Sequence, residues 1–258
     1  MILRPLIRLQ DYFAAACDGA GYTIGLVFES AAYLPRLGRR RREAISQLFV
    51  ACMGSLPLIV ITALFTGMII ALQTGVELQR FGQESALGFV VPITICRGMG
   101  PVFTAIAVTG LIGSMMASEL GTMKVSEEID ALQVMSINPV YYLVMPRVLA
   151  LALALPLLTV YTDAIGSLGG AVVANGKFGV SFDLYFRNAW QILKVKDVFG
   201  GLFKSFVFGL IIAGIACSQG LRAEHGAVGV GRATLRTVVF SFVYVLVFEY
   251  ILTWAIYQ

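Results

Sequence analysis

The chain has 258 residues, of which 58% are hydrophobic and 13% are charged, and its formal net charge is +4. Soluble domains are about 25% charged, so this chain has too few charges to cover so large an apolar mass with a polar surface. The composition excludes a disordered chain, a collagen-like repeat and a disulfide-stapled secreted domain, and it argues against a nucleic-acid partner. An integral membrane protein remains.

The first apolar segment, residues 13–34, is predicted to lie in the membrane interface instead of crossing the bilayer. Asp18 and Glu29 interrupt it, and an arginine cluster at residues 36–42 follows it. Such an interrupted apolar helix suits the plane of the interface. We expect a single domain over residues 1–258, with residues 1–47 as an N-terminal interfacial segment and residues 48–257 as the transmembrane region.

Five later stretches are long and apolar enough to cross a bilayer, which takes about 20 residues in a helix. They are residues 48–72, 86–118, 148–162, 205–220 and 237–257. In lipid the backbone polar groups must be satisfied internally, which a helix does within one segment. The expected fold class is therefore all-α: an N-terminal interfacial helix, about five transmembrane helices and a short connecting helix.

The second of these stretches contains the run Arg97-Gly98-Met99-Gly100-Pro101. Proline removes a helix donor and glycine is permissive, so we predict a break in the helix there. The segment is either one long broken span or a re-entrant half-helix followed by a separate span, and the hydrophobic periodicity does not distinguish them.

Lysine and arginine residues set the predicted orientation, because they accumulate on the cytoplasmic side. The arginine cluster and the connections at residues 119–147 and 222–236 fall on one side, whereas the loop at residues 175–197 falls on the other. The N-terminus is therefore expected in the cytoplasm, and five crossings place the C-terminus outside.

A polar run at residues 118–132 separates the second and third spans. Ser126 is a suitable N-cap, and Glu127 with Glu128 in the first turn suits the positive end of a helix. The run predicts a short amphipathic cytoplasmic helix, which is either a docking element or a solvated connection. Its apolar face is predicted to hold Ile129, Leu132 and Met135, and Asn138-Pro139 is predicted to end it.

From Arg97 to Pro139 the chain resembles the MlaE-type (YrbE-type) permeases, the membrane subunits of lipid-trafficking ABC transporters. The resemblance rests on Arg97, Gly100-Pro101-Val102, Gly113-Ser114, Ala117, the run from Glu119 to Leu132, and Asn138-Pro139. The length, the interfacial segment and the number of crossings also agree. The resemblance implies a coupling helix near residues 119–138 that docks on a cytoplasmic ATPase.

The resemblance also implies the assembly around this chain. It implies a homodimer in the bacterial inner membrane, with a cytoplasmic ABC ATPase that holds ATP and Mg, an MCE-domain protein outside, and a small STAS-like cytoplasmic subunit. The cargo would be phospholipid or a similar lipid, moved between the inner membrane and the periplasmic side, where the C-terminus would lie. The chain itself would be neither an enzyme nor the holder of a cofactor. The alternative is a scaffold that docks the ATPase and the MCE-domain protein without transporting lipid.

Two groups of candidate site residues follow. The resemblance assigns coupling to the ATPase to Glu119, Gly121, Lys124, Glu127, Glu128 and Asp130, whereas the residue types themselves make Arg97, Gly98, Gly100 and Pro101 the candidates for lipid or cavity contact. A cation among apolar helices usually faces a cavity or a partner. The alternatives for Arg97 are that it reaches toward the interface or caps carbonyl groups of a broken helix.

Two departures from the family pattern concern charge. The family commonly has an acidic residue where this chain has Gly98, and often an arginine where this chain has Leu111. These absences count against a mechanism that depends on an ion pair at Arg97. The other ionisable residues in or near the spans, Asp163, Lys204 and Glu249, are interpreted as packing or interfacial groups, with Asp163 and Lys204 as a candidate pair.

Two further features are interpreted as structural. Residues 170–178 superficially match a phosphate-binding loop, but five residues separate Gly170 from Gly176 and Phe178 replaces the magnesium-binding Ser or Thr. The lone His225 cannot build a metal site. We therefore expect no catalytic residues and no metal site in this chain.

Overall fold

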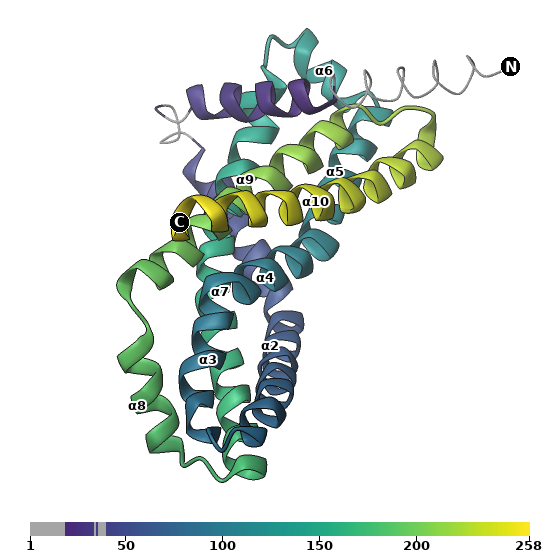
Figure 1. Cartoon of the computed structure of the whole chain (residues 1–258). Helices are drawn as coiled ribbons and strands as arrows, with labels where there is room; N and C mark the ends of the chain where they lie inside the picture. Colours follow the sequence, from purple (N-terminus) through teal and green to yellow (C-terminus); the bar gives the residue numbers. More distant parts are fainter. Residues whose placement is uncertain (1–18, 34, 36–39) are drawn as a thin grey trace, which may run out of the picture.

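The computed structural model describes residues 19–33, 35 and 40–258, and within them it contains helices and no strand (Figure 1). Five helical segments are long and apolar enough to cross a bilayer: α2 (Arg41–Arg80), Glu84–Val125, Val140–Phe178, α9 (Val195–Leu221) and α10 (Gly226–Tyr257). This confirms the all-α membrane fold and the five predicted spans. Each helical segment is longer than the apolar stretch that predicted it.

The second span shows that the predicted break is wrong. It consists of a short 3-10 turn (Glu84–Ala86), α3 (Leu87–Thr94), α4 (Gly100–Val108) and α5 (Ser114–Val125), joined by π-helical turns at Ile95–Met99 and Thr109–Gly113. The helical path is continuous, so the re-entrant alternative is excluded. The first π-turn keeps the helix continuous up to Gly100 and Pro101, because the Gly100 N–H bonds to the carbonyl of Ile95, five residues back.

The long helix α7 (Met145–Phe178) lies at the centre of the molecule, after a π-turn at Val140–Val144. It packs against α2, α4 and α9, and α10 packs against α5 and α9. Of the most apolar stretch of each helix, 72% is buried in the third span but only 22% in α2 and 11% in α10. The α2 and α10 helices therefore present large apolar faces outward, as a lipid solvent allows.

Two features mark the opposite ends of the molecule (Figure 1). A helix at residues 19–32 and the short helix α6 (Glu128–Val134) lie together at one end, which we call the α6 end. At the other, the α8 end, the predicted loop at residues 175–197 contains an ordered helix, α8 (Phe182–Ile192), which Ser181 caps by accepting from the Leu184 N–H. Asn188 fixes α8 to the second span by donating to the Ser85 carbonyl at 2.9 Å.

The helix at residues 19–32 is not among the five candidate spans and lies across the ends of the long helices (Figure 1). Its Leu26 is buried, whereas Phe28 is exposed on the other face. Thr23 and Val27 contact Gly214 of α9 so closely that a Cβ there would lie 2.7 Å from Val27. Residues 1–18, 34 and 36–39, which include part of the predicted interfacial segment and of the arginine cluster, lie outside the described residues.

Glycines set the close crossing of α2 and α7. A Cβ at Gly67 would overlap the backbone of Gly166, and one at Gly169 would overlap the carbonyl of Leu64. We predict that Gly67→Ala lowers the stability of the solubilised chain by about 1–3 kcal/mol, because the helices must separate. Gly54→Ala on the same helix is the control, since its Cβ would make an ordinary contact 3.5 Å from Ile112. Thermal unfolding measures both, and equal melting temperatures would contradict the prediction.

Candidate functional site

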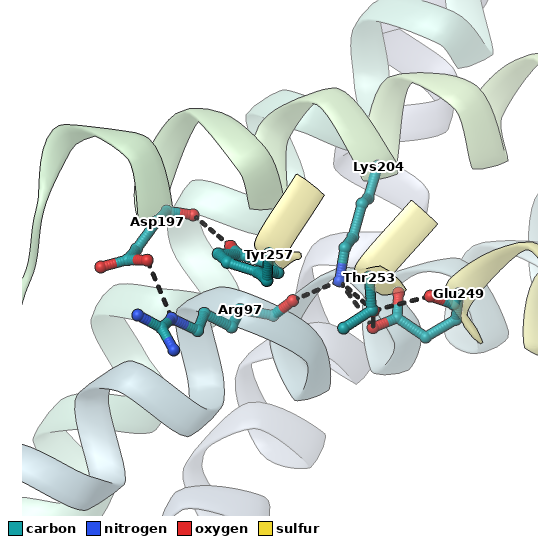
Figure 2. Close-up of polar contacts among 6 residues, drawn as sticks. All are labelled: Arg97, Asp197, Lys204, Glu249, Thr253 and Tyr257. Carbon is teal, nitrogen blue, oxygen red and sulfur yellow. Dashed lines mark hydrogen bonds and ion pairs between the residues drawn. The ribbon is translucent and has the colours of Figure 1, made fainter. Parts of the chain in front are cut away.

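The proline of the second span leaves a backbone group that a lysine from α9 satisfies. Pro101 has no N–H to donate to the carbonyl of Arg97, four residues earlier. The Nζ of Lys204 instead donates to that carbonyl at 2.6 Å (Figure 2). Gly201 makes this approach possible, because a Cβ at that position would overlap the carbonyl of Cys96.

Lys204 is fully buried, and two groups of α10 complete its coordination. Its Nζ lies 2.8 Å from Glu249 Oε1 and 2.6 Å from Thr253 Oγ1, and Thr253 also bonds to the Glu249 backbone carbonyl (Figure 2). A buried charge needs an ion pair and hydrogen bonds to offset its lost hydration. Lys204 and Glu249 therefore join the second span, α9 and α10. The predicted pairing of Lys204 with Asp163 is therefore wrong, and Asp163 lies against Gly100.

Arg97 does have an ion-pair partner, so the sequence-based argument against one is corrected. Its Nε donates to Asp197 Oδ1 at 2.8 Å, and its guanidinium lies 4.8 Å from the centre of the Tyr257 ring (Figure 2). Asp197 is buried and also accepts from the Lys194 N–H at the start of α9. Asp197 thus supplies the negative charge that an acidic residue at position 98 would give. Position 98 also has little room for a side chain, because a Cβ there would lie 3.2 Å from Glu249 Oε1.

The four predicted lipid or cavity residues differ in their access. The Arg97 side chain is 43% exposed, and Gly98 is half-buried beside it. Gly100 and Pro101 are buried within the chain, and a Cβ at Gly100 would overlap the carboxyl of Asp163. Arg97 is therefore the member of this group whose side chain can reach a ligand, and the other three shape the backbone around it.

The helix predicted to couple to an ATPase, at the α6 end, is shorter than predicted, and its capping differs. It covers Glu128–Val134, and Glu127 precedes it in the left-handed conformation at φ 62°. The prediction of Ser126 as its N-cap is wrong: Ser126 ends α5, and its hydroxyl donates to the Thr122 carbonyl. The turn between α5 and α6 is therefore too short for Ser126 to end α5 and also to cap the start of α6.

The end of the coupling helix also differs from the prediction. Helix α6 ends at Val134, before Asn138-Pro139. The Asn138 side chain instead accepts from the Val140 N–H at 2.8 Å, so this pair begins the next helical segment. Asn138 also donates to Glu29 and Tyr33 of the N-terminal segment, which connects that segment to the coupling region.

The six predicted coupling residues are in two settings. Ion pairs or packing hold four of them: Lys124 pairs with Asp130 at 2.7 Å, Glu119 pairs with Arg147 at 3.1 Å, and Gly121 lies against Ala223. Glu127 and Glu128 are exposed.

An exposed apolar tip of α6 was missed by the sequence analysis. Val134 is 86% exposed and Met135 is 61% exposed, whereas Ile129 is buried. Only Ile129 and Leu132 of the predicted apolar face therefore pack inward. The sequence did contain a signal for this tip, because Val134 lies off the helix face that holds Ile129. It was missed because the helix was predicted to continue to Asn138-Pro139, whereas it ends at Val134.

A cavity of about 580 Å³ lies between α6 and the N-terminal helix, with Tyr22, Lys124, Ile129 and Asn138 in its wall. Burial raises the pKa of Tyr22, while the Arg222 guanidinium, 4.0 Å from its ring centre, acts in the opposite direction. Among the described residues no group of three His, Cys, Asp or Glu side chains is placed to hold a metal ion.

These features define a multi-pass helical membrane protein with a polar network inside the bundle and a short helix presented at one end. A family model described as Permease MlaE matches residues 44–255. The chain belongs to the MlaE permease family, and it is the permease of an ABC transporter.

Its relatives agree with that assignment. A probable ABC transporter permease protein of Synechocystis is 37% identical over 218 residues, 84% of this chain and 83% of the relative. One of Rickettsia typhi is 39% identical over 207 residues, 80% of each chain. The chloroplastic protein TRIGALACTOSYLDIACYLGLYCEROL 1 of Arabidopsis thaliana is 36% identical over 217 residues, 84% of this chain and 62% of that protein.

We predict that Lys204→Met lowers the stability of the chain by about 3–5 kcal/mol, because it leaves the Glu249 carboxylate without its cation. The double variant Lys204→Met/Glu249→Met should recover most of that loss, since it removes both charges. Thermal unfolding in detergent measures all three proteins. A double variant no more stable than the single one would show that the ion pair does not account for the burial of Lys204.

Proposed function

We propose that this chain moves phospholipid or a similar lipid between the bacterial inner membrane and the periplasmic side, driven by a separate cytoplasmic ABC ATPase. The observation that carries the proposal is α6, a helix with exposed Glu127 and Glu128 at its start and exposed Val134 at its tip. An apolar tip beside charges, set apart from the lipid-facing helices, is the kind of surface that a protein partner covers. ATP and Mg bind in that partner.

The path from α6 into the membrane runs through the second span. Asp130 of α6 pairs with Lys124 of α5, and Glu119 of α5 pairs with Arg147 of α7. The helix then continues through two π-turns to Arg97. A π-turn is a weaker point in a helix and is frequent at functional sites. A push on α6 would therefore change the helix path at these turns, provided that the ATPase binds the two conformations unequally.

Lipid contact is assigned to Arg97. Asp197 engages only its Nε, and the side chain is 43% exposed, so the terminal nitrogens can donate to a phosphate. The name of the Arabidopsis relative is that of a glycerolipid, which agrees with a lipid cargo. In this arrangement Asp197 positions the guanidinium and does not compete for all of its donors.

The remaining proposals concern the assembly. The outward apolar faces of α2 and α10 are suitable for a second copy of the chain, so the transporter is a homodimer. The α6 end, with Arg40, Arg41 and Arg42 at the start of α2, faces the cytoplasm and any STAS-like subunit, and the α8 end faces the periplasm and an MCE-domain protein. The C-terminus then lies on the periplasmic side.

We predict that Glu128→Lys leaves the transporter complex assembled but lowers lipid-stimulated ATP turnover by about tenfold or more, because charges across an interface fix the register of the two partners. Glu77→Lys is the control, since Glu77 is an exposed acid at the α8 end. ATP hydrolysis by the reconstituted complex measures the effect. Unchanged turnover in Glu128→Lys would favour the scaffold that docks partners without transport.

A second prediction tests Arg97. Arg97→Ala should reduce the transfer of a fluorescent phospholipid between vesicles by about tenfold, because a charge-assisted hydrogen bond to the head group is lost. Arg97→Lys should retain part of the activity, since the charge remains. Insertion and dimerisation, measured by size-exclusion chromatography, should match those of the unaltered protein. Normal transfer by Arg97→Ala would exclude it as a lipid contact.

A further inference from the structure

A second cavity at the α6 end lies between the first two turns of α2 and the start of α7. Its volume is about 170 Å³, where one water molecule needs roughly 10–15 Å³. It is separate from the coupling surface of α6 and from Arg97. Its wall consists of Arg40, Glu43, Gln47, Tyr142, Leu143, Pro146 and Arg147.

Two polar atoms buried at this cavity have no hydrogen-bond partner among the described residues. The Arg147 side chain is more than nine-tenths buried, and its Nη1 and Nη2 donate to Leu143 and Glu119 at 3.1 Å each. Its Nε donor remains unpaired, and so does the Oε1 acceptor of Gln47. An unsatisfied buried polar group is costly, and more so on a charged side chain. The wall therefore holds one donor, Arg147 Nε, and one acceptor, Gln47 Oε1, that the described residues leave unpaired.

The rest of the wall repeats this division between donors and acceptors. The Arg40 guanidinium lies 3.7 Å from the centre of the Tyr142 ring, which fixes it at the cavity wall. Its Nη1 donates to Glu43 Oε1 at 3.1 Å, and the Glu43 side chain is 48% exposed. Two arginines can therefore bind an anion, while Gln47 and Glu43 can bind a cationic or hydroxyl donor beside it.

The position of the cavity indicates the source of such a ligand. Glu43 is the last charged residue before a charge-free run at residues 44–76 of α2, so Arg40, Glu43 and Gln47 lie at the level of the lipid head groups. Because most of α2 faces outward, lipid reaches this surface from the side. A phospholipid head group presents a phosphate and an adjacent donor at this depth.

We propose that this cavity binds the head group of a resident phospholipid, whose phosphate accepts from Arg147 Nε and Arg40. The ammonium of a phosphoethanolamine group then donates to Gln47 and Glu43. This site needs only the membrane-spanning fold and is independent of the transport proposal. It connects α2 to Arg147, which also holds Glu119 of α5, so the bound lipid stabilises the membrane end of the coupling region.

The test uses the full chain, delipidated in detergent and titrated with dioctanoyl phosphatidylethanolamine in native mass spectrometry. Gln47→Leu removes the acceptor that the ammonium would meet, and it should weaken one binding event per chain by about tenfold or more, because a hydrogen bond to a charged group is lost. Gln79→Leu is the control, since Gln79 is an exposed glutamine at the other end of α2. Equal binding by the two variants would overturn the proposal.

Two additional arms separate the possible ligands. Dioctanoylglycerol, which lacks phosphate, should not occupy the site, and inorganic phosphate alone should not displace the phospholipid at matched concentration. Displacement by inorganic phosphate would assign the site to a free anion and overturn the lipid assignment. If Gln47→Leu does not purify as a folded protein, Arg40→Gln removes a cationic donor to the phosphate and should cause the same loss, and unchanged binding by that variant would equally overturn the proposal.

Discussion

The contact between the Lys204 ammonium and the Arg97 carbonyl is the constraint on which the membrane region depends. Pro101 removes the donor that this carbonyl would have in a regular helix, and the bilayer offers no water to replace it. A buried lysine supplies the bond, and its charge in turn requires Glu249 of α10. A local property of one proline thus joins the second span, α9 and α10.

A second connection lies at the α6 end of the same span. There Glu119 pairs with Arg147 of α7, and Lys124 pairs with Asp130 of α6. The two connections hold a helix that contains two π-turns between them. In the proposed mechanism, a displacement of α6 bends this helix at those turns, because the packed ends resist deformation.

The comparison between sequence and structure is clearest for particular residues. The apolar runs predicted all five spans, because lipid imposes a length on every helix that crosses it. The same reasoning failed at Gly100-Pro101, since a π-turn and a distant lysine repaired a helix that local rules would break. It also failed at Ser126, which was predicted to cap the start of α6. Ser126 instead ends α5, because the short turn there has to complete one helix before the next one begins.

The sequence alone determined the membrane class, the number of spans, the acidic coupling segment and the family resemblance. These properties follow from composition and short-range pattern, which act over a few residues of one segment. Only the tertiary structure decided that Arg97 pairs with Asp197 and that Lys204 supports the Arg97 carbonyl, across 100 and 107 positions in the chain. Pairings at that separation depend on which helix faces pack together, and no local pattern in a single sequence encodes that choice.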